Sequence, residues 1–127
     1  MIKALCLHLV DRLGLVVAAA GGTLFAGYFP DDAPDSASAV CERGLDPVDP
    51  YVGNHEKSVQ VLTRGLDYHE ARARAVTIHA TLSAMVNVQL TGWFVYTVTG
   101  SAPSYLGPDK RGRHTFTTNV LVRAKEA

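Results

Sequence analysis

The pattern of apolar and polar residues along the chain predicts two helices. Apolar residues recur at three- and four-residue steps through residues 2–16, which is typical of an amphipathic helix, and the glycine pair at 21–22 ends that segment. A second apolar stripe with the same spacing occupies residues 71–85. Asp67 and Glu70 precede this stripe as a capping box, in which both side chains accept hydrogen bonds from the first turn of a helix.

Alternating apolar and polar residues predict strands at residues 23–29, 36–44 and 58–65. The turn PDDAPD separates the first two, and we expect them to pair as antiparallel neighbours. Two Asp-Pro steps exclude a helix in residues 45–57, which we expect to be irregular. After the second helix come VNVQL and two further strands, TGWFVYTVTG and HTFTTNVLVR. We expect these two to form a rigid hairpin that presents the polar loop SAPSYLGPDKRGR to a partner.

This order of elements predicts an α+β fold. We expect an antiparallel sheet with two helices packed on one face, which is an α/β sandwich. The 127 residues correspond to a single domain, so we expect residues 1–127 to fold as one unit. A chain of this size buries about two-thirds of its extended surface, which is enough for one core without disulfides or metal.

Charge is balanced overall but is distributed unevenly along the sequence. Residues 1–63 contain eight acids and four bases, whereas residues 64–127 contain four acids and eight bases. Chance can explain this difference, because sequence halves need not be faces of the molecule. Alternatively, the molecule has an acidic side and a basic side, which suits head-to-tail association into a ring. Zero net charge argues against nucleic acid as the main partner.

The sequence offers no recognisable catalytic constellation. Its five histidines lack metal-binding spacing, and neither a nucleophile elbow nor a phosphate-binding loop occurs. Cys6 and Cys41 lie in apolar patterns, so we expect two buried thiols in a reducing compartment. We therefore predict no enzymatic activity, no catalytic residues, no cofactor and no metal.

The N-terminal segment does not match a targeting signal. His8, Asp11 and Arg12 interrupt the apolar run that a signal peptide requires. The same charges argue against a transmembrane helix. We therefore expect a cytosolic, soluble protein that has no membrane partner.

Candidate contacts with partners lie in the predicted loops. Three aspartates in the PDDAPD turn could bind a divalent cation, although turn formation alone explains them. The basic cluster of the SAPSYLGPDKRGR loop could contact nucleic acid, or it could be a solvated turn. Exposed loop aromatics commonly anchor protein partners. The candidate protein-interface residues are Asp31, Asp32, Asp35, Tyr51, Tyr105, Leu106, Lys110, Arg111 and Arg113.

Three segments together resemble a known family: LFAGYFPDDAPDSASAVCERGLDP, SVQVLTRGLDYHEARARAVTIHATL and SAPSYLGPDKRGRHTFTTNVLVR. The shared pattern is a strand ending in a Pro-Asp turn, a V-Q-V-x-x-R-G strand leading to a D-Y-x-x-A helix, and a late P-x-x-L-G-x-D-x-x-G-R hairpin. In this order the segments are similar to the minor capsid and tail terminator proteins of long-tailed bacteriophages. A run of alanines and glycines at residues 18–22 departs from the pattern.

The resemblance implies a structural virion protein of the tail or neck, assembled in the host cytoplasm. Such a protein forms a ring, expected to be six-fold, that caps the tail tube and helps join the tail to the head. Its implied partners are further copies of itself, the tail tube protein and a head-completion or stopper protein. Two alternatives stay open: another minor capsid or head-tail joining protein of the same fold, and a small ligand-binding domain.

Overall fold

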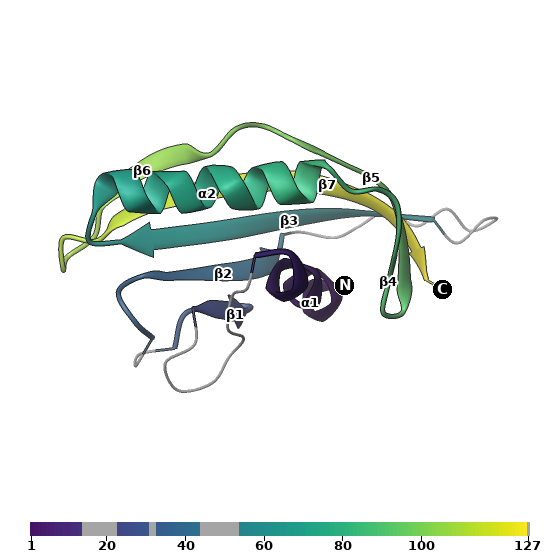
Figure 1. Cartoon of the computed structure of the whole chain (residues 1–127), viewed down its shortest axis with the longest axis horizontal. Helices are drawn as coiled ribbons and strands as arrows, with labels where there is room; N and C mark the ends of the chain where they lie inside the picture. Colours follow the sequence, from purple (N-terminus) through teal and green to yellow (C-terminus); the bar gives the residue numbers. More distant parts are fainter. Residues whose placement is uncertain (14–22, 31–32, 44–53, 127) are drawn as a thin grey trace.

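Two helices lie against a curled sheet in the computed structural model, which describes residues 1–13, 23–30, 33–43 and 54–126 (Figure 1). The described residues contain seven strands, all in one sheet. The elements in chain order are α1 (Ile2–Leu13), β1 (Leu24–Ala26), β2 (Ala37–Glu42), β3 (Asn54–Gly65), α2 (Tyr68–Ser83), β4 (Val86–Leu90), β5 (Trp93–Gly100), β6 (Ser104–Pro108) and β7 (His114–Glu126). The predicted α+β class is therefore confirmed.

Strands β3 and β7 form the centre of the sheet. They pair in antiparallel register along their whole lengths, from Asn54 opposite Lys125 to Gly65 opposite His114. The strand order is β1-β2-β3-β7-β5-β4, and β6 also pairs with β7. On the edge of β7 that faces away from β3, strand β6 pairs with residues 114–117 and β5 pairs with residues 120–126. The predicted hairpin between the last two long strands is confirmed as the antiparallel pair β5–β7.

The predicted antiparallel pairing of the first two strands is wrong. Strand β1 runs parallel to β2, with Leu24 opposite Ser38 and Ala26 opposite Val40. Two parallel strands cannot be joined by a tight turn, so the chain has to run back to the level where β1 begins before it enters β2. The other strand pairs of the sheet are antiparallel.

Three predicted boundaries change in the structure. Strand β1 is shorter than the predicted strand at residues 23–29. Strand β3 begins at Asn54, so residues 54–57 are strand and not irregular, because the far end of β7 provides their pairing partner. The predicted loop SAPSYLGPDKRGR contains the short strand β6. The first helix is described as far as Leu13, and residues 14–16 of the prediction lie outside the described residues.

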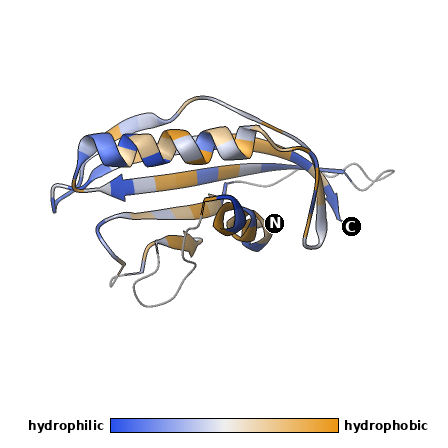
Figure 2. Ribbon diagram, viewed as in Figure 1, coloured by the Kyte–Doolittle hydropathy of each residue, from blue (hydrophilic) through white to orange (hydrophobic). Residues whose placement is uncertain are grey.

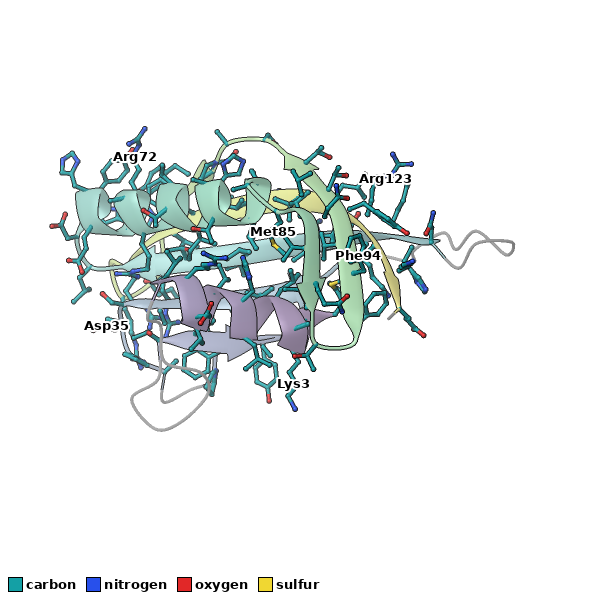
Figure 3. All side chains as sticks on the ribbon, turned by 45° about the vertical axis from the view of Figure 1, so that its right-hand side comes forward. Lys3, Asp35, Arg72, Met85, Phe94 and Arg123 are labelled. Atoms are coloured by element: carbon teal, nitrogen blue, oxygen red, sulfur yellow. The ribbon has the colours of Figure 1, made fainter. Side chains whose placement is uncertain are left out.

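Both helices contribute to one apolar core with the sheet. Leu5 and Leu9 of α1 and Ile78 and Leu82 of α2 are fully buried in the same cluster as Val61 of β3. Apolar and polar residues alternate in the middle of β3, where Val59 and Val61 are buried and Gln60 between them is half-buried. The hydropathy of β3 changes along its length (Figure 2). In Figure 3 the side chain of Met85 points into this interior, whereas that of Arg72 points away from α2.

A second, smaller cluster covers the opposite side of β2. Phe25, Ala37 and Ala39 are buried there, and Phe29 and Ala33 pack against them. The segment that follows β1 therefore folds over the sheet and buries β2 on both sides. This arrangement brings Ala33, Pro34 and Asp35 next to the end of β3 and the start of β7, where candidate contacts lie.

Candidate interface around the β6–β7 turn

The structure places six of the candidate interface residues at one end of the molecule. The other three, Asp31, Asp32 and Tyr51, lie outside the described residues. The end is formed by the turn between β6 and β7, the start of α2 and the segment before β2 (Figure 1). The six residues placed there are Asp35, Tyr105, Leu106, Lys110, Arg111 and Arg113.

Asp109 organises the turn between β6 and β7. Its Oδ1 accepts hydrogen bonds from the backbone N–H groups of Arg111 (2.9 Å) and Arg113 (3.0 Å), and its Oδ2 accepts one from Nε of Arg113 (2.7 Å). Desolvation opposes ionisation of this carboxyl. The three hydrogen bonds outweigh desolvation, and the pKa of Asp109 is lowered below its usual value. The turn is therefore held by an ionised carboxylate.

Arg113 joins this turn to the segment before β2. Its Nη1 lies 3.6 Å from Oδ1 of Asp35, and only 13% of its side chain is exposed. Lys110 and Arg111 are exposed at the tip of the same turn. The predicted basic cluster therefore divides into two exposed cations and one that is engaged inside the molecule.

Arg64 holds the same segment from the other side. The residue is 8% exposed, and its Nη2 donates to the carbonyl oxygens of Ala33 (3.2 Å) and Pro34 (3.0 Å). Its guanidinium carbon lies 4.2 Å from the centre of the Phe29 ring, within the range of a cation–π interaction. Burial lowers the pKa of Arg64, and the positive charge of Arg113 lowers it further. The sequence analysis includes Arg64 in the V-Q-V-x-x-R-G pattern but does not predict it as a site residue, although an arginine at the end of an alternating strand was a visible signal.

An aromatic cluster supports β6 against the start of α2. The ring of Tyr68 lies 5.1 Å from Tyr105, 5.6 Å from His114 and 5.4 Å from Phe116, measured between centroids. Nδ1 of His114 lies 2.7 Å from the hydroxyl oxygen of Tyr105. Of these residues only Tyr105 was predicted as a site residue. The others could not be selected from the sequence, because nothing in it brings the start of α2 next to β6.

Leu106 projects from a β-bulge. Tyr105 pairs with Phe116 and Gly107 pairs with Thr115, so Leu106 is the extra residue of β6. Gly107 has a φ of +97°, a conformation that favours glycine. Bulges commonly re-aim a side chain, and here Leu106 is 59% exposed beside Tyr105, which is 43% exposed. This end of the molecule therefore exposes Leu106 next to Tyr105, whose ring packs against other aromatic side chains.

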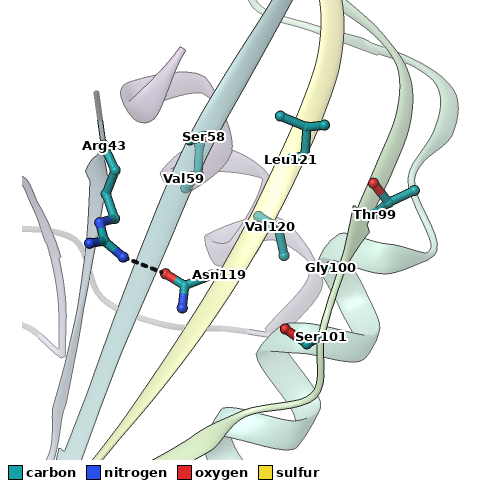
Figure 4. Close-up of a pocket in the computed structure, with 9 residues that line it drawn as sticks. All are labelled: Arg43, Ser58, Val59, Thr99, Gly100, Ser101, Asn119, Val120 and Leu121. Atoms are coloured by element: carbon teal, nitrogen blue, oxygen red, sulfur yellow. Dashed lines mark hydrogen bonds between the residues drawn. The ribbon is translucent and has the colours of Figure 1, made fainter. Parts of the chain in front are cut away.

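An open groove of about 600 Å³ crosses strands β3, β7 and β5 (Figure 4). Among the described residues that line it, Arg43 alone is charged, and Nη1 of Arg43 donates to Oδ1 of Asn119 at 3.2 Å. Gly100 lines the other side, where a Cβ would lie 2.3 Å from the carbonyl oxygen of Asn119. The described residues of this groove therefore provide no acid–base pair.

The described part of the chain shows no cluster suited to a metal ion. No group of three or more His, Cys, Asp or Glu side chains gathers within it. In the same part, every helix is too short or too polar to cross a membrane. The features that stand out are therefore the braced turn, the aromatic cluster and the projecting Leu106.

Comparisons with known proteins identify the family. A family model described as bacteriophage tail terminator protein matches residues 9–125. Among solved structures, the chain resembles one from the virion of a native gene transfer agent particle, with a TM-score of 0.64 and 14% sequence identity, over 98% of this chain and 94% of that chain. At this identity the likeness establishes a shared fold. No curated protein matches the chain. The family match covers most of the residues, so the chain belongs to the bacteriophage tail terminator family, a family of structural virion proteins and not of enzymes.

Proposed function

We propose that this protein caps the phage tail tube as a homo-oligomeric ring and helps join the tail to the head. The observation that carries the proposal is the match of the tail terminator family to residues 9–125. The ring is expected to be six-fold and to assemble in the host cytoplasm. Its partners would be other copies of the chain, the tail tube protein and a head-completion or stopper protein. Each subunit would be a single domain of residues 1–127 folded as an α/β sandwich.

The β6–β7 end is the contact surface in this proposal. Tyr105 and Leu106 would form its apolar centre, and Lys110 and Arg111 its charged rim, which is the usual anatomy of a protein interface. A surface that is already rigid loses less conformational entropy on binding, and the Asp109 turn supplies that rigidity.

The remaining candidates have different roles in the same assembly. Asp35 and Arg113 would act by holding the turn, since they pair with each other. Asp31, Asp32 and Tyr51, which lie outside the described residues, remain proposed contacts.

A second position in the particle is the alternative within this family. The structural relative is described only as part of a virion, and a fold does not fix position in a particle. A minor capsid or head-tail joining role is therefore the competing proposal. A small ligand-binding domain is less favoured, because the groove formed by the described residues is open to solvent and does not enclose an apolar interior.

Electron microscopy of lysates tests the proposal. The parent phage would be grown with this gene deleted, and with the deletion complemented by the wild-type gene in the same host. Tail length and head attachment would be scored in negatively stained samples of both.

We expect filled heads beside detached tails of excessive or irregular length in the deletion, and normal particles after complementation. Tails of normal length that fail to attach would favour the joining role. Intact particles without the gene would contradict any role in tail completion.

A further inference from the structure

Residues 33–36, which we call the strap, lie directly before β2 and are held by two arginine side chains. Arg64 donates to two backbone carbonyl oxygens of the strap, and Arg113 forms an ion pair with Asp35 of the strap. Arg64 belongs to β3, whereas Arg113 belongs to the β6–β7 turn, where it also pairs with Asp109. The strap is therefore linked to the sheet through Arg64 and to the turn through Arg113.

Arg64 is a fixed point for the strap. On β3 it lies opposite Ala37 of β2 on one side and Thr115 of β7 on the other. Its carbonyl oxygen accepts a hydrogen bond from Nη1 of Arg74 at 3.1 Å. Because the backbone of Arg64 is held in this way, a movement that separates the guanidinium from the carbonyl oxygens is a movement of the strap.

The apolar contacts of the strap are separate from the main core. Ala33 and Phe29 pack against Phe25, Ala37 and Ala39, and among the described residues this cluster shares no member with the cluster that contains both helices. Regions with few buried apolar contacts open at a lower free energy than the whole protein. The strap can therefore lift while the helices and the main core stay folded.

The docked strap leaves one donor of Arg64 unsatisfied. Nε of Arg64 is buried and has no hydrogen-bond partner among the described residues. A buried polar group without a partner destabilises the state that buries it, because it has lost water and gained no other acceptor. Lifting the strap returns water to this guanidinium, which offsets part of the contacts that are lost. The docked and lifted states are therefore closer in free energy than the contacts of the strap alone indicate.

We propose that the strap is a latch that alternates between a docked and a lifted state, and that its docking orders the β6–β7 turn. When the strap lifts, Arg113 loses its ion pair with Asp35 and retains the one with Asp109, so the turn becomes looser. Coupling of this kind is reciprocal. A partner that binds the ordered turn therefore also holds the strap docked. The latch is a property of the isolated chain, whereas its use in assembly rests on the proposed contact surface.

Hydrogen exchange of the purified protein, followed by NMR at single amides, tests the latch. The amide of Ala33 reports on the strap, because it donates to the carbonyl oxygen of Pro30 at 3.0 Å. The amides of Arg111 and Arg113 report on the turn, because both donate to Asp109.

Three variants separate the strap from its link to the turn. Phe29→Ala loosens the strap, since it removes the ring that lies 4.2 Å from the guanidinium carbon of Arg64. Asp35→Asn removes the ion pair that joins the strap to the turn. Phe94→Ala is the matched control, because Phe94 is a half-buried aromatic residue of β5 that packs on Tyr96 and Lys125.

In Phe29→Ala we expect exchange to accelerate at all three amides, by about three- to tenfold, as for residues coupled through a shared partner. When Asp35→Asn is already present, adding Phe29→Ala should still accelerate exchange at Ala33. It should no longer accelerate exchange at Arg111 and Arg113, because the link is absent. Phe94→Ala should leave all three amides unchanged.

Faster exchange at Ala33 with unchanged exchange in the turn would overturn the latch. So would unchanged exchange at Ala33, or an effect of Phe29→Ala on the turn that persists beside Asp35→Asn. If Phe29→Ala does not fold, Asp35→Asn alone decides: it should accelerate exchange in both the strap and the turn, and an effect on only one of them contradicts the coupling. The deletion experiment uses tail morphology and not exchange, so failure of the latch and failure of the proposed function are distinguishable.

Discussion

Nε of Arg113 lies 2.7 Å from Oδ2 of Asp109, and this pair closes the turn between β6 and β7. The same aspartate also accepts hydrogen bonds from two backbone N–H groups, so one carboxylate fixes the geometry of the whole turn. This turn also positions Tyr105 and Leu106, which precede it on β6. The shape of the proposed contact surface therefore depends on a side chain that need not touch the partner.

Replacing this carboxylate should loosen the turn without unfolding the protein. We expect Asp109→Asn to lower Tm at pH 7 and to speed hydrogen exchange at the amides of Arg111 and Arg113. Asp11→Asn is the control, because Asp11 is exposed on α1. Unchanged exchange at both amides would contradict the role given to Asp109.

The same variant should show a defined pH dependence. The pKa of Asp109 in the folded protein lies below the usual value of 3.8. The ionised carboxylate therefore stabilises the fold above about pH 4, and this contribution is lost as the pH falls through the lowered pKa. The Tm difference between wild type and Asp109→Asn should be constant at neutral pH and should shrink at lower pH. A difference that grows on acidification would refute the assignment.

The exposed and engaged cations of the turn should behave differently. Lys110→Gln with Arg111→Gln should change the free energy of unfolding by less than about 0.5 kcal/mol, as is usual for exposed residues. Arg113→Gln should destabilise by more, because it removes the ion pairs of this side chain with Asp35 and Asp109. Urea unfolding measures both effects. If the double variant complements the gene deletion fully, the two exposed cations are not contacts.

The hydroxyl and the ring of Tyr105 should contribute separately. We expect Tyr105→Phe to cost less than about 1 kcal/mol of unfolding free energy, since it removes one partly exposed hydrogen bond to His114. Tyr105→Ala should cost about 0.5–1.5 kcal/mol more, because the aromatic contacts with Tyr68 and Phe116 are also lost. Equal stabilities of the two variants would show that the ring contacts do not support β6.

Gly100 should tolerate no side chain. A Cβ there would lie 2.3 Å from the carbonyl oxygen of Asn119, so β5 would have to move away from β7. We expect Gly100→Ala to lower the free energy of unfolding by about 1–3 kcal/mol, a typical cost of overpacking. Thr99→Ala, one residue earlier and exposed, is the matched control. Chemical denaturation of both variants decides the question.

The elements of the fold could largely be predicted from the sequence because their patterns are local. The helix at residues 71–85 has a regular apolar spacing, and its N-cap is observed, with Asp67 accepting from the backbone N–H of His69. The hairpin partners β5 and β7 alternate clearly enough to be recognised. The buried position of Cys6 followed from the apolar spacing of α1, whereas the predicted burial of Cys41 is wrong, since this thiol is only half-buried.

Features that depend on distant segments could not be predicted. The direction of β1 depends on how the chain returns to β2, and the strand character of residues 54–57 depends on the far end of β7. Strand β6 was read as loop because Pro, Gly and Ser dominate it, yet pairing with β7 outweighs those preferences. The engagement of Arg113 with Asp35, far away in the sequence, was hidden for the same reason.

The central place of β7 in the sheet has a consequence for biosynthesis. Strand β3 pairs with it across a long sequence separation, as Gly65 opposite His114 illustrates. Until residues 114–126 leave the ribosome, the edges of β3 and β5 that face β7 lack their partner. Sheet completion must therefore follow translation of the last strand, and contacts between such distant residues form slowly. During that interval the unpaired strand edges are the kind of surface on which aggregation starts.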